Sequence, residues 1–94
     1  MTRKKIRVII EGRVQGVCFR METQHAARRI GVTGWARNRR DGSVEAVFEG
    51  APEKVEEMLA WCRKGPPLAR VDDVAVRDAD DQESFTDFTI RSTT

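Results

Sequence analysis

Two glycines and an arginine make one stretch of this sequence suited to chemistry: Gly12-Arg13-Val14-Gln15-Gly16-Val17-Cys18-Phe19-Arg20. An apolar run precedes the stretch, and residues with helical spacing follow it. Glycines allow a backbone to turn its N–H groups inward, and the N-terminus of a helix carries partial positive charge. Arg20 adds a planar charged group that binds phosphate oxygens in pairs. The stretch therefore predicts a phosphate cradle.

Familiar phosphate and nucleophile motifs do not fit this stretch. A Walker loop needs G-x-x-x-x-G-K-[ST], and neither that glycine spacing nor the lysine is present. Cysteine phosphatases use the spacing C-x-x-x-x-x-R, whereas Cys18 stands two residues before Arg20. The only histidine, His25, has no G-x-S-x-G serine and no H-E-x-x-H partner, so we expect a solvent-facing or half-buried helix residue. The sequence predicts neither a covalent nucleophile nor a metal site.

A phosphate held only by amides and one arginine suits a phosphoryl compound that is already activated. A carboxyl-phosphate anhydride qualifies, because its leaving carboxylate has a pKa of about 4 and needs no general acid at neutral pH. Catalysis then requires charge neutralisation and a positioned water. Asn38 is the candidate to hold that water, since it ends a strand and shares a face with Ala36. Taken alone, Asn38 fits better as a residue that serves the Asp41-Gly42 turn.

Composition and length limit the class of protein. With 94 residues, 39% hydrophobic and 34% charged, the chain is expected to form one soluble domain over residues 1–94. No apolar run reaches membrane-spanning length and no signal-peptide core follows Met1, so we expect a cytoplasmic protein without membrane contact. Cys18 and Cys62 match no zinc spacing. We expect two free, buried thiols and no cofactor.

Charge is unevenly distributed along the chain, although the net charge is only +2. Residues 1–50 hold 11 Lys and Arg against 5 Asp and Glu, and residues 51–94 hold 6 against 10. Positive potential therefore gathers in the half that carries the cradle, as steering of a small anion requires. The low net charge argues against a dedicated nucleic-acid binder. Arg37, Arg39 and Arg40 are expected to form a solvated basic edge.

Strand and helix patterns alternate along the chain. Strands are predicted over residues 6–11, 34–39, 44–49, 70–77 and 85–91, and helices over 20–30 and 52–64. Val8, Ile9 and Ile10 predict a first strand that is buried on both faces, and Phe88 and Ile90 are expected to point inward. Asp41-Gly42 predicts a hairpin, and residues 78–83 predict an acidic loop.

The order of these elements is βαββαβ with one extra terminal strand. A right-handed crossover places the second strand parallel to the first with a gap between them, and the hairpin returns the third strand into that gap. The second helix then brings the fourth strand to the far side of the first. The prediction is an α+β, ferredoxin-like split βαββαβ sandwich, with two helices on one face of an antiparallel, five-stranded sheet.

Two blocks of the sequence resemble the signature blocks of acylphosphatases, namely residues 12–20 and Gly34-Trp35-Ala36-Arg37-Asn38-Arg39-Arg40-Asp41-Gly42-Ser43-Val44-Glu45. The closing residues 85–90 are similar to that family's terminal strand, so the resemblance covers essentially the whole chain. It implies a five-stranded ferredoxin-like fold and hydrolysis of acyl phosphates to carboxylate and inorganic phosphate. It also implies that Asn38 orients the water and that the phosphate-binding residues are Gln15, Gly16, Val17, Cys18, Phe19 and Arg20.

Two other functions stay open at this point. A nucleic-acid or regulatory module on the same fold would stack bases on exposed sheet aromatics, but aromatic residues make up only 6% of this chain. An acylphosphatase-like module also occurs in larger carbamoyl-transfer maturation proteins. We expect a monomer that acts on a small acyl phosphate and binds no nucleic acid. Nothing in the sequence resembles a second recognition site for the acyl side.

Overall fold

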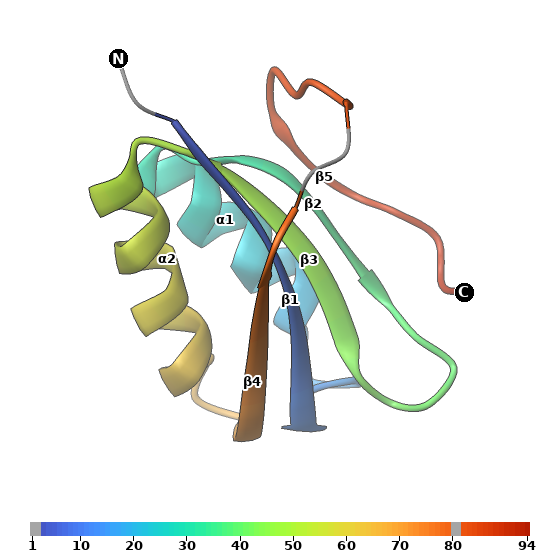
Figure 1. Ribbon diagram of the computed structural model, residues 1–94. Coiled ribbons are helices and arrows are strands. Elements are labelled where there is room, and N and C mark those ends of the chain that lie inside the picture. Colours follow the sequence, from blue (N-terminus) through green and yellow to red (C-terminus); the bar gives the residue numbers. More distant parts are fainter. Residues whose placement is uncertain (1–2, 80–81) are drawn as a thin grey trace.

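The computed structural model describes residues 3–79 and 82–94, which form one sheet covered on one face by two helices (Figure 1). The elements are, in chain order, β1 (Lys4–Arg13), α1 (Phe19–Ile30), β2 (Thr33–Asn38), β3 (Val44–Gly50), α2 (Pro52–Lys64), β4 (Arg70–Asp78) and β5 (Phe88–Ile90). The strand order is β4-β1-β3-β2-β5. The predicted topology is therefore confirmed, with β3 between β1 and β2 and with β4 on the far side of β1.

The terminal strand corrects one part of the prediction, because the sheet is mixed rather than entirely antiparallel. β5 pairs with β2 in parallel, and Gly34 lies opposite Phe88. The direction follows from the topology. β4 runs opposite to β1 and β2 runs with β1, so a chain that leaves the end of β4 reaches β2 at its start and continues alongside it. β5 is also shorter than predicted. Of the expected acidic loop, residues 80–81 lie outside the described residues.

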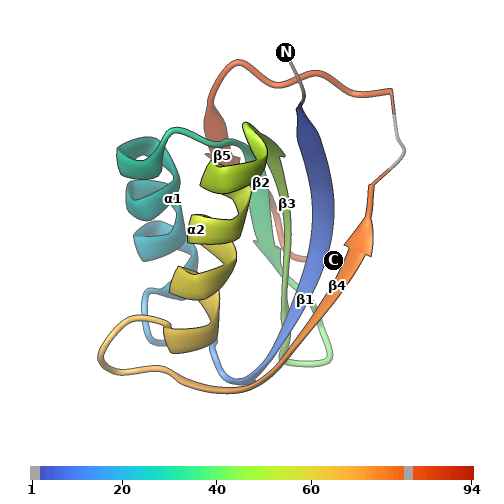
Figure 2. The same ribbon diagram turned by 60° about the vertical axis from the view of Figure 1, so that its left-hand side comes forward.

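The helices cover only one face of the sheet, as the edge-on view shows (Figure 2). Ile6, Val8 and Ile10 of β1 are fully buried beneath them, whereas the alternate residues of β1 are half-buried or exposed. The prediction that β1 is buried on both faces is therefore wrong. Apolar residues with period two bury one face of a strand, and no second layer covers the other.

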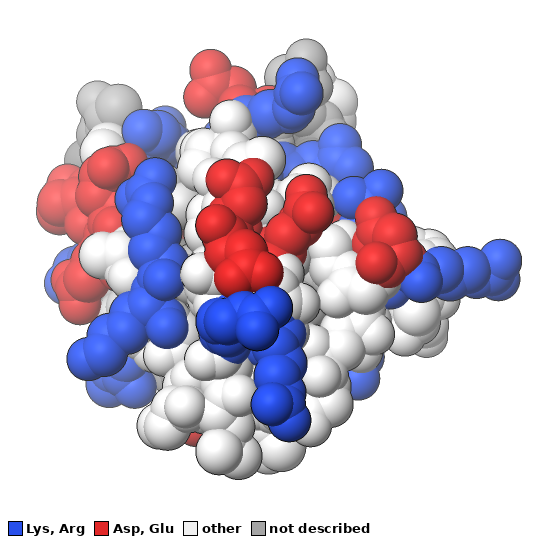
Figure 3. Space-filling view, turned by 90° about the horizontal axis from the view of Figure 1, so that it is seen from below, with Lys and Arg blue, Asp and Glu red and all other residues white. Residues whose placement is uncertain are grey.

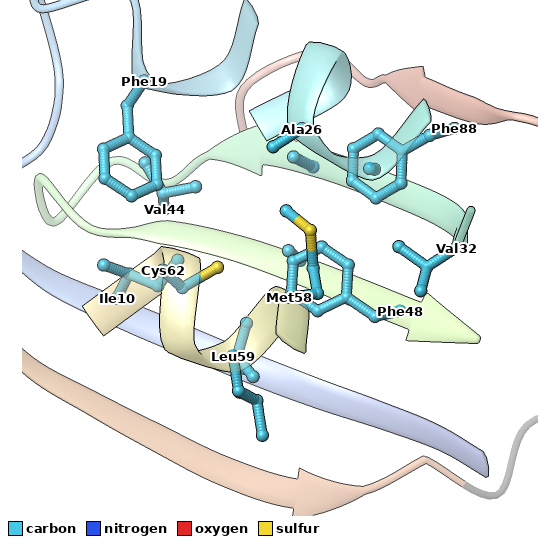
Figure 4. Packing of buried hydrophobic residues seen from close by; sticks show 14 of the residues in the cluster. Ile10, Phe19, Ala26, Val32, Val44, Phe48, Met58, Leu59, Cys62 and Phe88 are labelled. Atoms are coloured by element: carbon cyan, nitrogen blue, oxygen red, sulfur yellow. The ribbon is translucent and has the colours of Figure 1, made fainter. Parts of the chain in front are cut away.

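The core lies between the helices and the sheet (Figure 4). One stripe of α1 is buried and consists of Thr23, Ala26, Ala27 and Ile30. The stripe of α2, Val55, Met58, Leu59 and Cys62, is buried as well. Aromatic contacts stabilise each layer, since Phe48 of β3 stacks on Phe88 of β5 at 5.6 Å and Phe19 of α1 meets Trp61 of α2 edge-on at 5.7 Å. Gly31, with φ of 100°, ends α1.

The uncovered face of the sheet holds a charge cluster in place of an apolar layer. Glu45 is only 2% exposed and accepts hydrogen bonds from Arg7 Nε at 2.5 Å and Arg37 Nε at 2.8 Å. Trp35 lies between the guanidinium groups of Arg37 and Arg91, at 4.9 and 4.6 Å from its ring centre. Arg37 is thus a half-buried ion-pair partner and not part of a solvated edge.

No helix in the described part of the chain is long and apolar enough to cross a membrane.

Candidate active site

A tight loop of residues 15–18 joins the end of β1 to α1. Gly16 has φ of 74°, and Cys18, at the N-cap of α1, has φ of 60° and ψ of 26°. Among the described residues, Cys18 is the only residue other than glycine with positive φ. This left-handed conformation costs an L-residue about 1–2 kcal/mol, and such strain is typical of functional loops. Cys18 is also exposed, so the expectation of two buried thiols is wrong for it. Cys18 is exposed because it caps a helix at the protein surface, where no other element packs over its side chain.

The N-terminus of α1 is not capped by a side chain. The N–H of Glu22 donates to the carbonyl of Cys18 at 3.0 Å, and this is the first bond of the helix. The N–H groups of Phe19, Arg20 and Met21 therefore have no intrahelical acceptor. Together with the helix dipole, these free donors make a binding site for an anion.

Arg20 is the second residue of α1 and is half-buried. Its side chain has no ion pair or hydrogen bond with any described residue. Every other Lys or Arg in the described ranges is either paired, like Arg28 with Asp87 at 2.8 Å, or exposed. A cation at a helix N-terminus also opposes the dipole. The local charge at Arg20 is thus uncompensated and positive.

Asn38 is the last residue of β2, and it pairs with Val44 across the β2–β3 hairpin. As predicted, it shares a face of the sheet with Ala36, and this face packs against the helices. Its backbone carbonyl accepts from the N–H of Thr94 at 3.2 Å, while its carboxamide has no partner among the described residues. The side chain is therefore free to bind a ligand or a water.

One pocket of about 380 Å³ brings these groups together. It is lined by Val14, Gln15, Gly16, Cys18, Phe19, Arg20, Met21, Asn38 and Ile90. Figure 3 views the molecule from this end, where charged side chains crowd the upper part of the view and mostly uncharged surface fills the lower part. The two candidate catalytic residues thus share one pocket with most of the predicted cradle. The exception is Val17, whose side chain is 8% exposed and lines a neighbouring hollow.

The Gln15 side chain is directed at the hairpin. Its Nε2 donates to the carbonyl oxygen of Arg39 at 2.7 Å and to that of Ser43 at 2.9 Å. The carboxamide is therefore occupied by the protein, and only the backbone N–H of Gln15 remains for a phosphate. Because Arg39 follows Asn38 directly, Gln15 ties the 15–18 loop to the strand that carries Asn38.

The turn of the hairpin is itself fixed by hydrogen bonds. Asp41 Oδ1 accepts from the backbone N–H of Ser43 at 2.9 Å and from its hydroxyl at 2.6 Å. These bonds hold the pKa of the Asp41 carboxyl below its ordinary value. Gly42 has φ of 95°, as the predicted Asp-Gly turn requires. The hairpin turn that follows Asn38 is therefore fixed both by Gln15 and by its own hydrogen bonds.

Met21, Ile90 and Val14 line the pocket but were missed from the sequence. Ile90 was predicted to point inward, yet it is 40% exposed at the edge of the sheet. Met21 carried a signal, because it is a large apolar residue off the buried stripe of α1 and next to Arg20. His25 is exposed, as expected, and its Nδ1 lies 3.3 Å from Glu22 Oε1. Within residues 3–79 and 82–94, no group of three or more His, Cys, Asp or Glu side chains is placed to hold a metal ion.

Known proteins resemble this chain in sequence and in fold. The acylphosphatase family model matches residues 6–90. A curated acylphosphatase of Syntrophobacter fumaroxidans is 51% identical over 90 residues, which cover 96% of this chain and 93% of that protein. The chain belongs to the acylphosphatase family. A hydrolase of this family acts on an acid anhydride, the carboxyl-phosphate bond of a small acyl phosphate.

Solved structures agree with the family membership. An acylphosphatase from Coxiella burnetii superposes with a TM-score of 0.89 at 34% identity, covering 95% of this chain and 93% of that one. Full-length HypF, in a phosphate- and nucleotide-bound form, contains a similar region with a TM-score of 0.87 at 26% identity. That region covers 98% of this chain but only 12% of HypF. The acylphosphatase fold is thus found both in proteins of this length and within a much larger one.

Proposed function

We propose that this acylphosphatase holds the phosphoryl group of its substrate with the backbone N–H groups of residues 15–19 and the guanidinium of Arg20. In this proposal Asn38 accepts a hydrogen bond from the attacking water and keeps it in line with the phosphorus. The residues of the pocket then act by neutralising charge and by fixing positions.

One observation carries the proposal. Arg20 is half-buried beside an uncapped helix N-terminus, without a counter-charge among the described residues, and it shares its pocket with the free carboxamide of Asn38. An isolated positive charge at a positive helix end is unfavourable unless an anion neutralises it. A phosphate would supply that charge and would accept hydrogen bonds from the free N–H donors.

The chemical step requires no covalent intermediate. The oxygen of water forms a bond to phosphorus while the bond from phosphorus to the bridging carboxyl oxygen breaks. The bonding electron pair leaves with the carboxylate, and the water proton passes to the phosphate product or to solvent. Because a carboxylate with a pKa of about 4 leaves without protonation, we propose that neither a general acid nor a metal ion takes part.

Acyl phosphate turnover by the purified protein tests this assignment. Wild-type protein is expected to hydrolyse acetyl phosphate in the presence of EDTA, with inorganic phosphate as a competitive inhibitor. Arg20→Ala removes two charge-assisted hydrogen bonds, each of about 1.5–3 kcal/mol, so kcat/KM should fall by at least about a hundredfold. Asn38→Ala should lower kcat by about a hundredfold or more and change the phosphate inhibition constant little.

Arg29→Ala is the matched control, since Arg29 is an exposed arginine on the same helix with no partner among the described residues. It is expected to keep wild-type kinetics. Full activity of folded Arg20→Ala or Asn38→Ala protein would contradict the proposed roles. Complete loss of wild-type activity in EDTA, restored by added metal, would contradict the metal-free step.

A further inference from the structure

Large apolar side chains are exposed around the proposed phosphate site. In the described part of the chain, four large apolar side chains are exposed: Met21 at 47%, Leu68 at 76%, Val76 at 40% and Ile90 at 40%. Met21 and Ile90 line the phosphate pocket, and Leu68 lines the hollow next to it. Val76 alone lies elsewhere, on β4. Exposed apolar side chains gathered at one place indicate a surface that binds something apolar.

The neighbouring hollow has a volume of about 350 Å³ and forms an apolar groove, whose walls are Val17, Cys18, Met21, Pro66, Pro67 and Leu68, with Glu22 as its one charged residue. Cys18 and Met21 line both the groove and the phosphate pocket. The two spaces therefore lie next to each other along the N-terminal turn of α1. A molecule whose phosphate occupies the pocket can extend its other end along the groove.

Resting on the proposed function, we propose that this groove binds the acyl chain of the substrate and makes the enzyme selective for neutral, apolar acyl phosphates. The position of the groove beside the phosphate pocket identifies this occupant, because the acyl group is joined to the phosphoryl group by one oxygen. Leu68 and Met21 are the residues expected to set the preference, since they offer the largest exposed apolar side chains along the path.

The charge of the groove points to the same substrates. A carboxylate or second phosphate at the far end of an acyl chain would lose water against the prolines and leucine of the groove. It would also come near Glu22, the one acidic residue that lines the groove. Both effects disfavour an acidic acyl chain and leave an aliphatic chain unaffected.

A chain-length series measures the proposal directly. A fully buried methylene contributes about fourfold to binding, so a methylene half-covered by an open groove should contribute about twofold. From acetyl to hexanoyl phosphate, kcat/KM of the wild-type protein should therefore rise by about fifteenfold, mainly through a lower KM. Glutaryl phosphate, of similar length but with a terminal carboxylate, should gain little over acetyl phosphate.

Leu68→Ser should reduce the hexanoyl-to-acetyl ratio to a few-fold, because the side chain is 76% exposed and its loss leaves the core intact. Val76→Ser is the matched control, and it should keep the wild-type ratio and wild-type activity. Inorganic phosphate should inhibit all three proteins equally, because the groove lies outside the phosphate pocket.

The outcomes separate this inference from the proposed function. Hydrolysis of acetyl phosphate without any gain for hexanoyl phosphate, or an equal gain in Leu68→Ser, would refute the groove while leaving the assignment of Arg20 intact. A wild-type dimer in sedimentation velocity that Leu68→Ser dissociates, with an unchanged acyl preference, would assign the groove to a second copy of the chain and refute the proposal.

Discussion

Replacing Gln15 by methionine tests whether the 15–18 loop and the β2–β3 hairpin act as one unit. Methionine keeps the length of the side chain but cannot donate to the carbonyl oxygens of Arg39 and Ser43. Both carbonyls retain another partner, because Arg39 O accepts from the N–H of Gly42 and Ser43 O accepts from the N–H of Arg39. No acceptor is orphaned, so the free energy of unfolding should fall by only about 1–2 kcal/mol.

The effect on catalysis should be larger than the effect on stability. Without the two bonds, the loop that is proposed to hold phosphate can shift relative to Asn38, and a displacement near 1 Å costs about a hundredfold in rate. We expect kcat for acetyl phosphate to fall between about tenfold and a hundredfold. The inhibition constant of inorganic phosphate should change less than about threefold, because the backbone donors and Arg20 remain.

Gln24→Met is the matched control for this experiment. Gln24 Nε2 donates to the carbonyl of Phe88 at 2.9 Å, so the same substitution removes a bond of the same type away from the hairpin. It should lower stability, measured by urea unfolding, and leave kcat unchanged. If Gln15→Met loses stability but keeps wild-type kcat, or if both variants lose kcat equally, Gln15 has no positioning role.

Two further predictions concern titratable groups. Burial raises the pKa of Glu45, but its hydrogen bonds to two arginines outweigh burial and leave that pKa lowered. The carboxylate should therefore stabilise the fold fully above about pH 4.3, and this contribution should be lost as the pH falls through the folded pKa. The difference in unfolding free energy between wild type and Glu45→Gln should shrink over the same pH range. Burial raises the pKa of the Cys62 thiol to about 12. A thiol reagent at pH 8 should therefore modify exposed Cys18 in the native protein and Cys62 only after unfolding. Equal modification rates for the two thiols would contradict the burial of Cys62.

Short-range sequence patterns predicted the secondary structure and the strand order of this protein. The periodic residues of the two helices, the Asp41-Gly42 turn and the alternating strands predicted the order of the sheet correctly, because each of these signals is local. No local sequence pattern indicates the direction of β5. It depends on which edge of the sheet is free and on the direction in which β4 ends, so it follows from the assembled topology only.

The candidate site shows the same division. Residue types and spacing indicated Arg20, whereas the choice of Asn38 depended on the resemblance to acylphosphatases. The structure brings the two residues to one pocket. Nothing local indicated that the Gln15 carboxamide reaches the hairpin 24 residues away, or that a loop after α2 brings Leu68 beside Met21. The sequence therefore predicted the polar centre of the site but not its apolar border. The roles of Arg20 and Asn38 stay predictions until the variants are measured.

The parallel pairing of β5 with β2 has a consequence for the behaviour of the protein at high concentration. A bare edge strand offers unpaired N–H and C=O groups to other chains and promotes aggregation. At one edge of the sheet, the short strand β5 pairs with β2 and covers it. At the opposite edge, β4 carries exposed charged residues, among them Arg70, Asp72 and Arg77. β5, whose Ile90 lines the pocket, thus also protects the edge of β2 from pairing with other protein molecules. A truncation that removes Phe88 and the residues after it would both remove a wall of the catalytic pocket and expose β2 to intermolecular β-pairing.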